Sequence, residues 1–213
     1  MTNRVTFLVD GFNLYFSVLR AEIGEGIHRL RWLDVHGLLR SYLSVFGQGA
    51  ALEKIHFFTA IPSYRQRYDP GVVHGHETHL QALNGSGVQL HVAGFKRKSL
   101  TCRHCGRWIE RHEEKETDVS LGVMAIELLH LEACDTLVIV SGDTDFAPAI
   151  RASKRLFPAA QICVAFPHAR FNAELQQIAD LSFRIRGARY AEHQLPDPVE
   201  LLNGRRLRRP PGW

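Results

Sequence analysis

Short apolar segments alternate with longer amphipathic ones along this chain. The short segments are mostly continuous runs of apolar residues rather than alternating apolar and polar ones, which is typical of strands buried on both faces. These runs predict strands at residues 4–9, 54–60, 88–92, 136–140 and 161–166. A shorter run at residues 182–185 is a candidate for a last strand.

The longer segments have apolar residues at helical spacing. They predict helices at residues 33–46, 68–83, 117–131, 146–157 and 172–179. The clearest is 117–131, whose apolar stripe is Leu121, Met124, Ala125, Leu128 and Leu129. This alternation indicates an α/β protein in which a parallel sheet of about five strands carries helices on both faces. In such sheets ligands bind at the carboxyl ends of the strands.

Composition narrows the class of protein. The chain has 213 residues, 45% hydrophobic and 23% charged, which suits one sizeable core. No apolar run approaches the roughly 20 residues of a membrane span, and residues 1–11 lack a signal-peptide pattern. We therefore expect a cytoplasmic protein with no membrane partner. Cys134 and Cys163 lie in apolar patterns and are expected to be reduced core residues.

The charge is basic and unevenly spread. The net charge of +4 leans toward a polyanionic partner. We expect one domain over residues 1–190, with an insertion at 94–114, followed by a basic tail at 191–213. The tail ends in NGRRLRRPPGW and is expected to be mobile, where it either contacts phosphates or only adds solubility.

Four acids are predicted to gather at one edge of the sheet. Asp10 ends the first strand, Asp143 and Asp145 follow the fourth, and Asp118 lies in the first turn of helix 117–131. Converging carboxylates raise each other's pKa unless a hard cation such as Mg²⁺ or Mn²⁺ lies among them. Individually, Asp145 also suits a helix cap and Asp118 a helix dipole. Taken together, the four acids favour a metal site.

Two polar residues accompany these acids. Asn13 and Ser141 are placed to hydrogen-bond either the acids themselves or the waters of a bound metal ion. The sequence around them falls into three motifs in a fixed order. They are VDGFN at residues 9–13, EKETDVSLGVMAIEL at 114–128 and VSGDTDFAPAI at 140–150.

The three motifs resemble the NYN domain, a branch of the PIN-like nuclease superfamily, and above all the bacterial stand-alone NYN proteins. The resemblance covers residues 4–186 and implies a Rossmann-like, PIN-like sheet with an acidic metal-binding pocket. It also implies metal-dependent endonuclease activity, mainly on RNA. By match, Asp10, Asp118, Asp143 and Asp145 are the metal-binding acids, and Asn13 and Ser141 belong to the pocket. Asn172 matches more loosely, with helix capping as its alternative role.

The expected reaction is attack on a phosphodiester by water activated by a divalent metal, so no Ser or Cys nucleophile is required. The alternative is a catalytically weak or inactive module with the same fold, which binds RNA or has a regulatory role. A phosphohydrolase with an aspartate nucleophile is a weaker alternative. Such an enzyme needs a DxD motif directly after the first strand, and here Gly-Phe-Asn follows Asp10.

The insertion carries a cysteine pair. Cys102 and Cys105 precede Gly106 in the CxxCG form of a zinc knuckle, on a predicted hairpin. Two thiolates leave a zinc site half complete, so His104, His112, His91 or His74 are candidates to complete it, as is a second chain in a homodimer. Bound zinc or iron, a plain hairpin with two thiols and a redox pair all remain open.

The insertion is also basic. Its charges, with one tryptophan, form a candidate arm for guiding single-stranded RNA, and the alternative is a surface for dimer contacts. A lysine at the start of helix 117–131 is a further candidate for a phosphate contact. These residues are Lys96, Arg97, Lys98, Arg103, Arg107, Trp108, Arg111 and Lys115.

Overall fold

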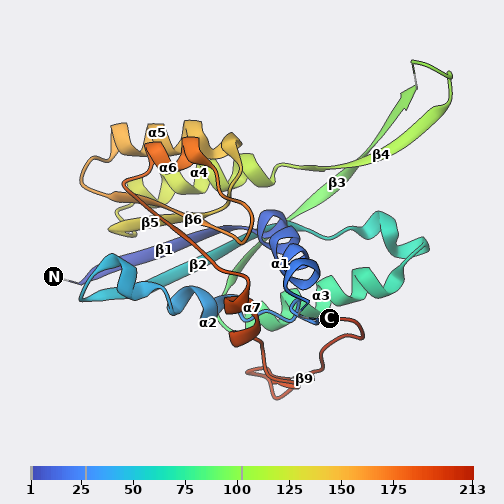
Figure 1. Cartoon of the computed structure of the whole chain (residues 1–213), viewed down its shortest axis with the longest axis horizontal. Coiled ribbons are helices and arrows are strands. Elements are labelled where there is room, and N and C mark those ends of the chain that lie inside the picture. Colours follow the sequence, from blue (N-terminus) through green and yellow to red (C-terminus); the bar gives the residue numbers. More distant parts are fainter. Residues whose placement is uncertain (1, 27, 102) are drawn as a thin grey trace.

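The computed structural model describes residues 2–26, 28–101 and 103–213 and is built on one large sheet (Figure 1). Six strands run parallel in the order β3-β2-β1-β5-β6-β7, and β4 pairs antiparallel with β3. The strands are β1 (Asn3–Asp10), β2 (Ala50–Ala60), β3 (Gln89–Thr101), β4 (Trp108–Lys115), β5 (Thr136–Val140), β6 (Gln161–Phe166) and β7 (Leu181–Arg184). The predicted parallel α/β sheet is confirmed, with six strands instead of about five.

Helices cover both faces of the sheet, as predicted. They are α1 (Gly11–Glu25), α2 (Val35–Arg40), α3 (Pro70–Gly85), α4 (Thr117–His130), α5 (Ala147–Leu156), α6 (Ala173–Ile178) and α7 (Ala188–Glu192). Because side chains alternate along a strand, Phe7 and Val9 pack toward α1, α2 and α3, whereas Leu8 packs toward α4 and α5. In the described part of the chain, no helix is both long and apolar enough to cross a membrane.

Helix α1 is a feature that the sequence pattern did not predict. The helices predicted from the sequence begin at residue 33, yet α1 starts directly after β1 with Asp10 as its N-cap. A Cβ at Gly11 would lie 2.6 Å from the carbonyl oxygen of Phe58, so the close approach of α1 to β2 requires glycine there. The predicted helix 33–46 is instead split into α2 and a 3₁₀ turn at Leu43–Phe46.

The C-terminal segment is packed against the domain, so the expected mobility of NGRRLRRPPGW is wrong. Strands β8 (Val199–Glu200) and β9 (Arg206–Leu207) form a small antiparallel pair, and Leu207 is buried. Trp213 is only 3% exposed and lies against Gly75 of α3, where any larger side chain would collide with its indole. Apolar contacts therefore hold this segment in place despite its charge.

Candidate functional site

The strand order reverses between β1 and β5, and in open α/β sheets the crevice at such a point is where ligands bind. Asp10 is the last residue of β1, and Ser141 follows β5 directly. The two meet across the crevice, where Ser141 Oγ donates to Asp10 Oδ2 at 2.9 Å. The Asn13 backbone N–H donates to the other oxygen, Asp10 Oδ1, at 3.0 Å. The Asp10 carboxylate is therefore held by the first turn of α1 and by the loop after β5.

The loop after β5 is tied to α1 by a second set of bonds. The Gly142 N–H donates to Asn13 Oδ1 at 3.2 Å, and the Asp143 N–H donates to Ser141 Oγ at 3.1 Å. Asp143 Oδ1 in turn accepts the Asp145 N–H at 3.1 Å. The hydrogen bonds of Asn13 and Ser141 thus position the acid-bearing loop, in addition to holding Asp10.

Burial and mutual repulsion perturb the acids. Burial, as the main cause, raises the pKa of Asp10 to about 6, although the hydrogen bonds from Asn13 and Ser141 oppose it. The negative charges of Asp118 and Asp143 add to the rise. Loss of surrounding water raises the pKa of Asp118, and the charges of Asp143 and Asp145 reinforce that shift. The four predicted acids therefore interact electrostatically at one edge of the sheet.

None of these four acids forms an ion pair with a described Lys, Arg or His side chain. A carboxylate pocket without a cationic side chain suits a bound cation. Among the described residues, no three His, Cys, Asp or Glu side chains are already arranged to hold a metal ion. Mg²⁺ commonly uses one or two carboxylates and keeps several waters. The all-oxygen donor set therefore fits a hydrated hard cation rather than a protein cage that fully encloses the ion.

The predicted hairpin projects from the body of the domain as a two-stranded arm (Figure 1). We call residues 94–115 the arm; its strands pair from Gly94↔Lys115 to Thr101↔Trp108. At its base, Phe95 contacts Tyr64 and Phe12, with ring centroids 5.1 and 6.0 Å away. These aromatic contacts join the arm to the start of α1, which is also where the acids lie.

The charges of the arm are partly neutralised within it. Lys96 Nζ lies 3.3 Å from Glu116 Oε1, and Arg97 Nη1 lies 3.2 Å from Glu110 Oε1. Lys98 and Lys115 are exposed but take part in interactions of their own, whereas Arg103 and Arg107 are exposed and Trp108 is 76% exposed. The side chain of Arg111 lies outside the described part of the structure. The arm therefore still presents basic groups and an aromatic ring to solvent.

The cysteine pair stays a prediction, because Cys102 lies outside the described residues. Cys105 is exposed at the turn of the arm. Two of the histidines proposed to complete a zinc site have other contacts. His91 Nε2 lies 3.0 Å from His56 Nδ1, and His112 stacks on Tyr64 with ring centroids 4.2 Å apart.

The roles of four further residues become clear only from the structure. Asn172 caps α6, because its Oδ1 accepts the Leu175 N–H at 3.1 Å, which is the alternative role foreseen for it. The fold also brings three residues to the edge of the sheet where the acids lie, and no sequence motif marked them. They are Phe16, Arg170 and Phe171. The available signal was position: Phe16 is three residues after Asn13, and residues 170–171 follow strand β6.

Fold and site together define a PIN-like α/β domain with acids at its switch point. The family model of the NYN domain matches residues 4–185, and the chain belongs to the NYN domain family. This family has a PIN-like nuclease fold and its domains are generally ribonucleases.

A crystal structure of a protein of unknown function from Vibrio parahaemolyticus RIMD 2210633 is similar to this chain in fold. The TM-score is 0.52 at 19% sequence identity, and the match covers 86% of this chain and 93% of that one. A comparison with curated protein sequences finds no match.

Proposed function

We propose that this protein is a divalent-metal-dependent endoribonuclease that hydrolyses phosphodiester bonds in RNA. The observation that carries the proposal is the group of four acids at the switch point of an NYN domain, where no described Lys, Arg or His side chain forms an ion pair with them. Uncompensated negative charge would repel a phosphodiester, so the pocket suits RNA only when a cation is bound there. Membership of a family whose domains are generally ribonucleases supports RNA as the substrate.

Each polar residue has a role in this proposal. Asp10, Asp118, Asp143 and Asp145 would hold the cation, some directly and others through water. When bound, a divalent cation supplies charge stabilisation to the phosphoryl oxygens and lowers the pKa of a coordinated water. Ser141 and Asn13 fix the Asp10 carboxylate and the loop that carries Asp143, which keeps the donors preorganised.

The arm would lie along the substrate. Its basic residues and Trp108, together with Lys115, are proposed to contact the RNA backbone and stack on an unpaired base. The arm runs directly into α4, whose first turn contains Asp118, so RNA held on the arm would lead to the acids. The zinc knuckle and a homodimer through the arm stay predictions.

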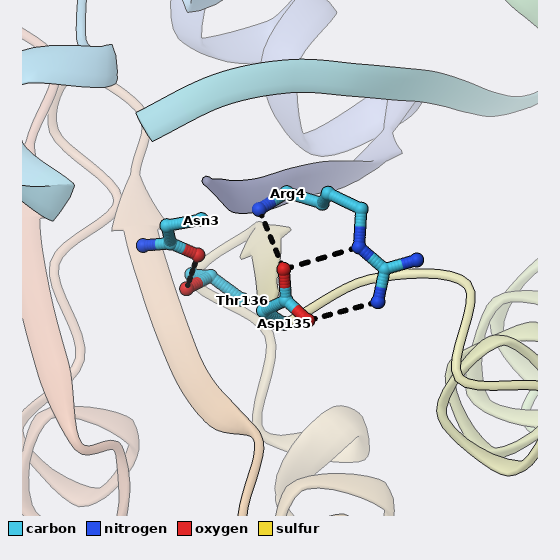
Figure 2. A network of polar contacts seen from close by, with 4 residues as sticks. All are labelled: Asn3, Arg4, Asp135 and Thr136. Atoms are coloured by element: carbon cyan, nitrogen blue, oxygen red, sulfur yellow. Dashed lines mark hydrogen bonds and ion pairs between the residues drawn. The ribbon is translucent and has the colours of Figure 1, made fainter. Parts of the chain in front are cut away.

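The proposal is tested by cleavage of labelled single-stranded RNA and DNA of equal length, with Mg²⁺, with Mn²⁺ and with EDTA. The variant is Asp143→Asn, and the matched control is Asp135→Asn, an acid at the opposite edge of the sheet that is paired with Arg4 (Figure 2). We expect RNA cleavage that requires metal, is lost in Asp143→Asn and persists in Asp135→Asn. RNA binding without cleavage under every condition would instead identify a non-catalytic RNA-binding module.

A further inference from the structure

Two phenylalanines are partly exposed at the edge where the acids lie. Phe16 of α1 is 48% exposed, and Phe171, in the loop after β6, is 41% exposed. Single exposed apolar residues are common on protein surfaces, so their exposure alone carries little weight. Their position beside the acids and the arginines that flank them make them informative.

Direct packing links these residues to the acid-bearing loop. Gly142 immediately precedes Asp143, and a Cβ at Gly142 would lie 1.8 Å from the carbonyl oxygen of Arg170. The same glycine donates its N–H to Asn13, which lies one helical turn before Phe16 on α1. Arg170 therefore packs against the acid-bearing loop, Phe16 lies one turn along α1 from a residue bonded to that loop, and Phe171 follows Arg170 in the chain.

Each phenylalanine has an arginine over its ring. The guanidinium carbon of Arg170 lies 6.0 Å from the ring centroid of Phe16, and that of Arg184 lies 3.9 Å from the ring centroid of Phe171. Neither arginine forms an ion pair with a described acid, and Arg170 Nε is buried without a hydrogen-bond partner there. These two cations are therefore not neutralised by the described acids and remain available to an anionic ligand.

The aromatic surface continues toward the arm. The rings of Phe12 and Phe16 stack with centroids 6.4 Å apart, and Phe12 contacts Phe95 at the base of the arm. We call Phe95, Phe12 and Phe16 the aromatic ridge. It starts at the base of the arm and runs along α1, and Arg170 over Phe16 connects it to Phe171, the next residue in the chain.

We propose that Phe16 and Phe171, with Arg170 and Arg184, form a binding site for unpaired RNA nucleotides beside the acids. This inference rests on the proposed function and deepens it by naming the side chains, outside the arm, that would hold unpaired nucleotides next to the acids. Bases stack on aromatic rings and on guanidinium planes only when they are unpaired, because pairing buries their faces in a duplex. The arginines would contact the flanking phosphates, which the acids themselves repel.

The test measures binding with Ca²⁺ in place of Mg²⁺ and Mn²⁺, because a hard cation with oxygen ligands offsets the charge of the acids. A gel of the recovered probe checks that it stays intact. The probe is a fluorescent single-stranded RNA of twelve nucleotides, and its dissociation constant is read from anisotropy. We expect Phe16→Ala and Phe171→Ala each to weaken binding by roughly 5- to 100-fold, the range for losing one stacked base. Phe16→Tyr keeps the ring and should bind like the wild type. Leu156→Ala is the control, because Leu156 is exposed at the opposite edge, near Asp135.

An abasic oligomer of the same length separates stacking from charge. It should bind the wild type and Phe171→Ala equally, because it retains the phosphates but offers no base. Wild-type protein that does not bind the RNA, or alanine variants that bind it as the wild type does, would overturn the inference even if RNA is cleaved. Binding that depends on both rings, in a protein that never cleaves RNA, would support the inference and refute the proposed function.

Discussion

Acids lie at both ends of strands β1 and β5, and the two ends differ in the partners that surround these acids. At the amino edge, Asp135 precedes β5 and is held by Arg4 of β1 (Figure 2). The Arg4 backbone N–H and Nε donate to Asp135 Oδ2 at 2.8 and 3.1 Å, and Arg4 Nη2 donates to Oδ1 at 2.8 Å. These hydrogen bonds lower the pKa of Asp135.

At the carboxyl edge of the same strands, burial and neighbouring acids raise the pKa of Asp10 to about 6. Its hydrogen bonds come from a hydroxyl and a backbone N–H, neither of which carries a full positive charge. Asp135, which has a structural role, is thus paired with the cationic side chain of Arg4. The acids at the carboxyl edge form no ion pair with a cationic side chain in the described part of the chain, which is consistent with a cation that comes from solution.

The comparison is tested most strongly by catalysis. Asp118→Asn and Asp143→Asn should each reduce the rate of RNA cleavage by at least about 100-fold, the scale for removing a group that stabilises charge in the transition state. Asp135→Asn should leave the rate within about twofold, because that acid acts on stability and lies at the other edge. The rates are measured with excess Mn²⁺ on the same labelled RNA. Equal losses in all three variants would remove the distinction between the edges.

The next effect is on stability and its dependence on pH. The pKa of Asp10 is about 6 in the folded protein against 3.8 ordinarily, so the folded state binds this proton more tightly than the unfolded state. Below about pH 4, Asp10 is protonated in both states and does not lower the free energy of unfolding. As the pH rises from about 4 to about 6, ionisation of the unfolded state lowers this free energy progressively, and above about pH 6 the loss is complete. The neutral variant Asp10→Asn should be more stable than the wild type at neutral pH by up to about 3 kcal/mol.

That gain should disappear as the pH falls toward about 4, where Asp10 in the wild type is itself protonated. Urea unfolding of both proteins at several pH values measures the difference, and titratable groups that do not interact with Asp10 cancel in the comparison. An advantage of Asp10→Asn that is the same at every pH would show that the buried charge is not its cause.

The smallest effect is expected at the amino edge. Asp135→Asn should lower the melting temperature slightly, because it replaces a charge-assisted pair that is largely exposed to solvent. The loss should shrink at high salt and as acid protonates Asp135 in the wild type, since its lowered pKa stabilises the fold only while it is ionised. Thermal melts at two salt concentrations measure this. A rise in melting temperature would contradict a structural role for the pair.

The sequence predicted the part of the molecule that follows from strand order. Continuous apolar runs located the parallel strands, and parallel strands place Asp10, Asp143 and Asp145 at one edge without knowledge of side-chain contacts. Helix α1 was missed because Gly11 is required by the nearby carbonyl of Phe58, a contact that no local pattern reveals.

The aromatic ridge was missed for a similar reason. Phe16 and Arg170 are far apart in the sequence and approach each other only because Gly142 lets the loop after β6 pack against the loop after β5. The buried Trp213 is a further case: a basic, proline-containing segment was read as mobile, although one aromatic residue packed on α3 holds it in place.

The most direct test of the central claim is calorimetric titration of Mn²⁺ into the wild type, Asp143→Asn and Asp135→Asn in the absence of RNA. We expect Mn²⁺ to bind the wild type and Asp135→Asn, with binding lost or much weakened in Asp143→Asn. Mn²⁺ binding that is unchanged in Asp143→Asn, or no binding by the wild type at millimolar Mn²⁺, would contradict the claim that the unpaired acids of the carboxyl edge hold a cation.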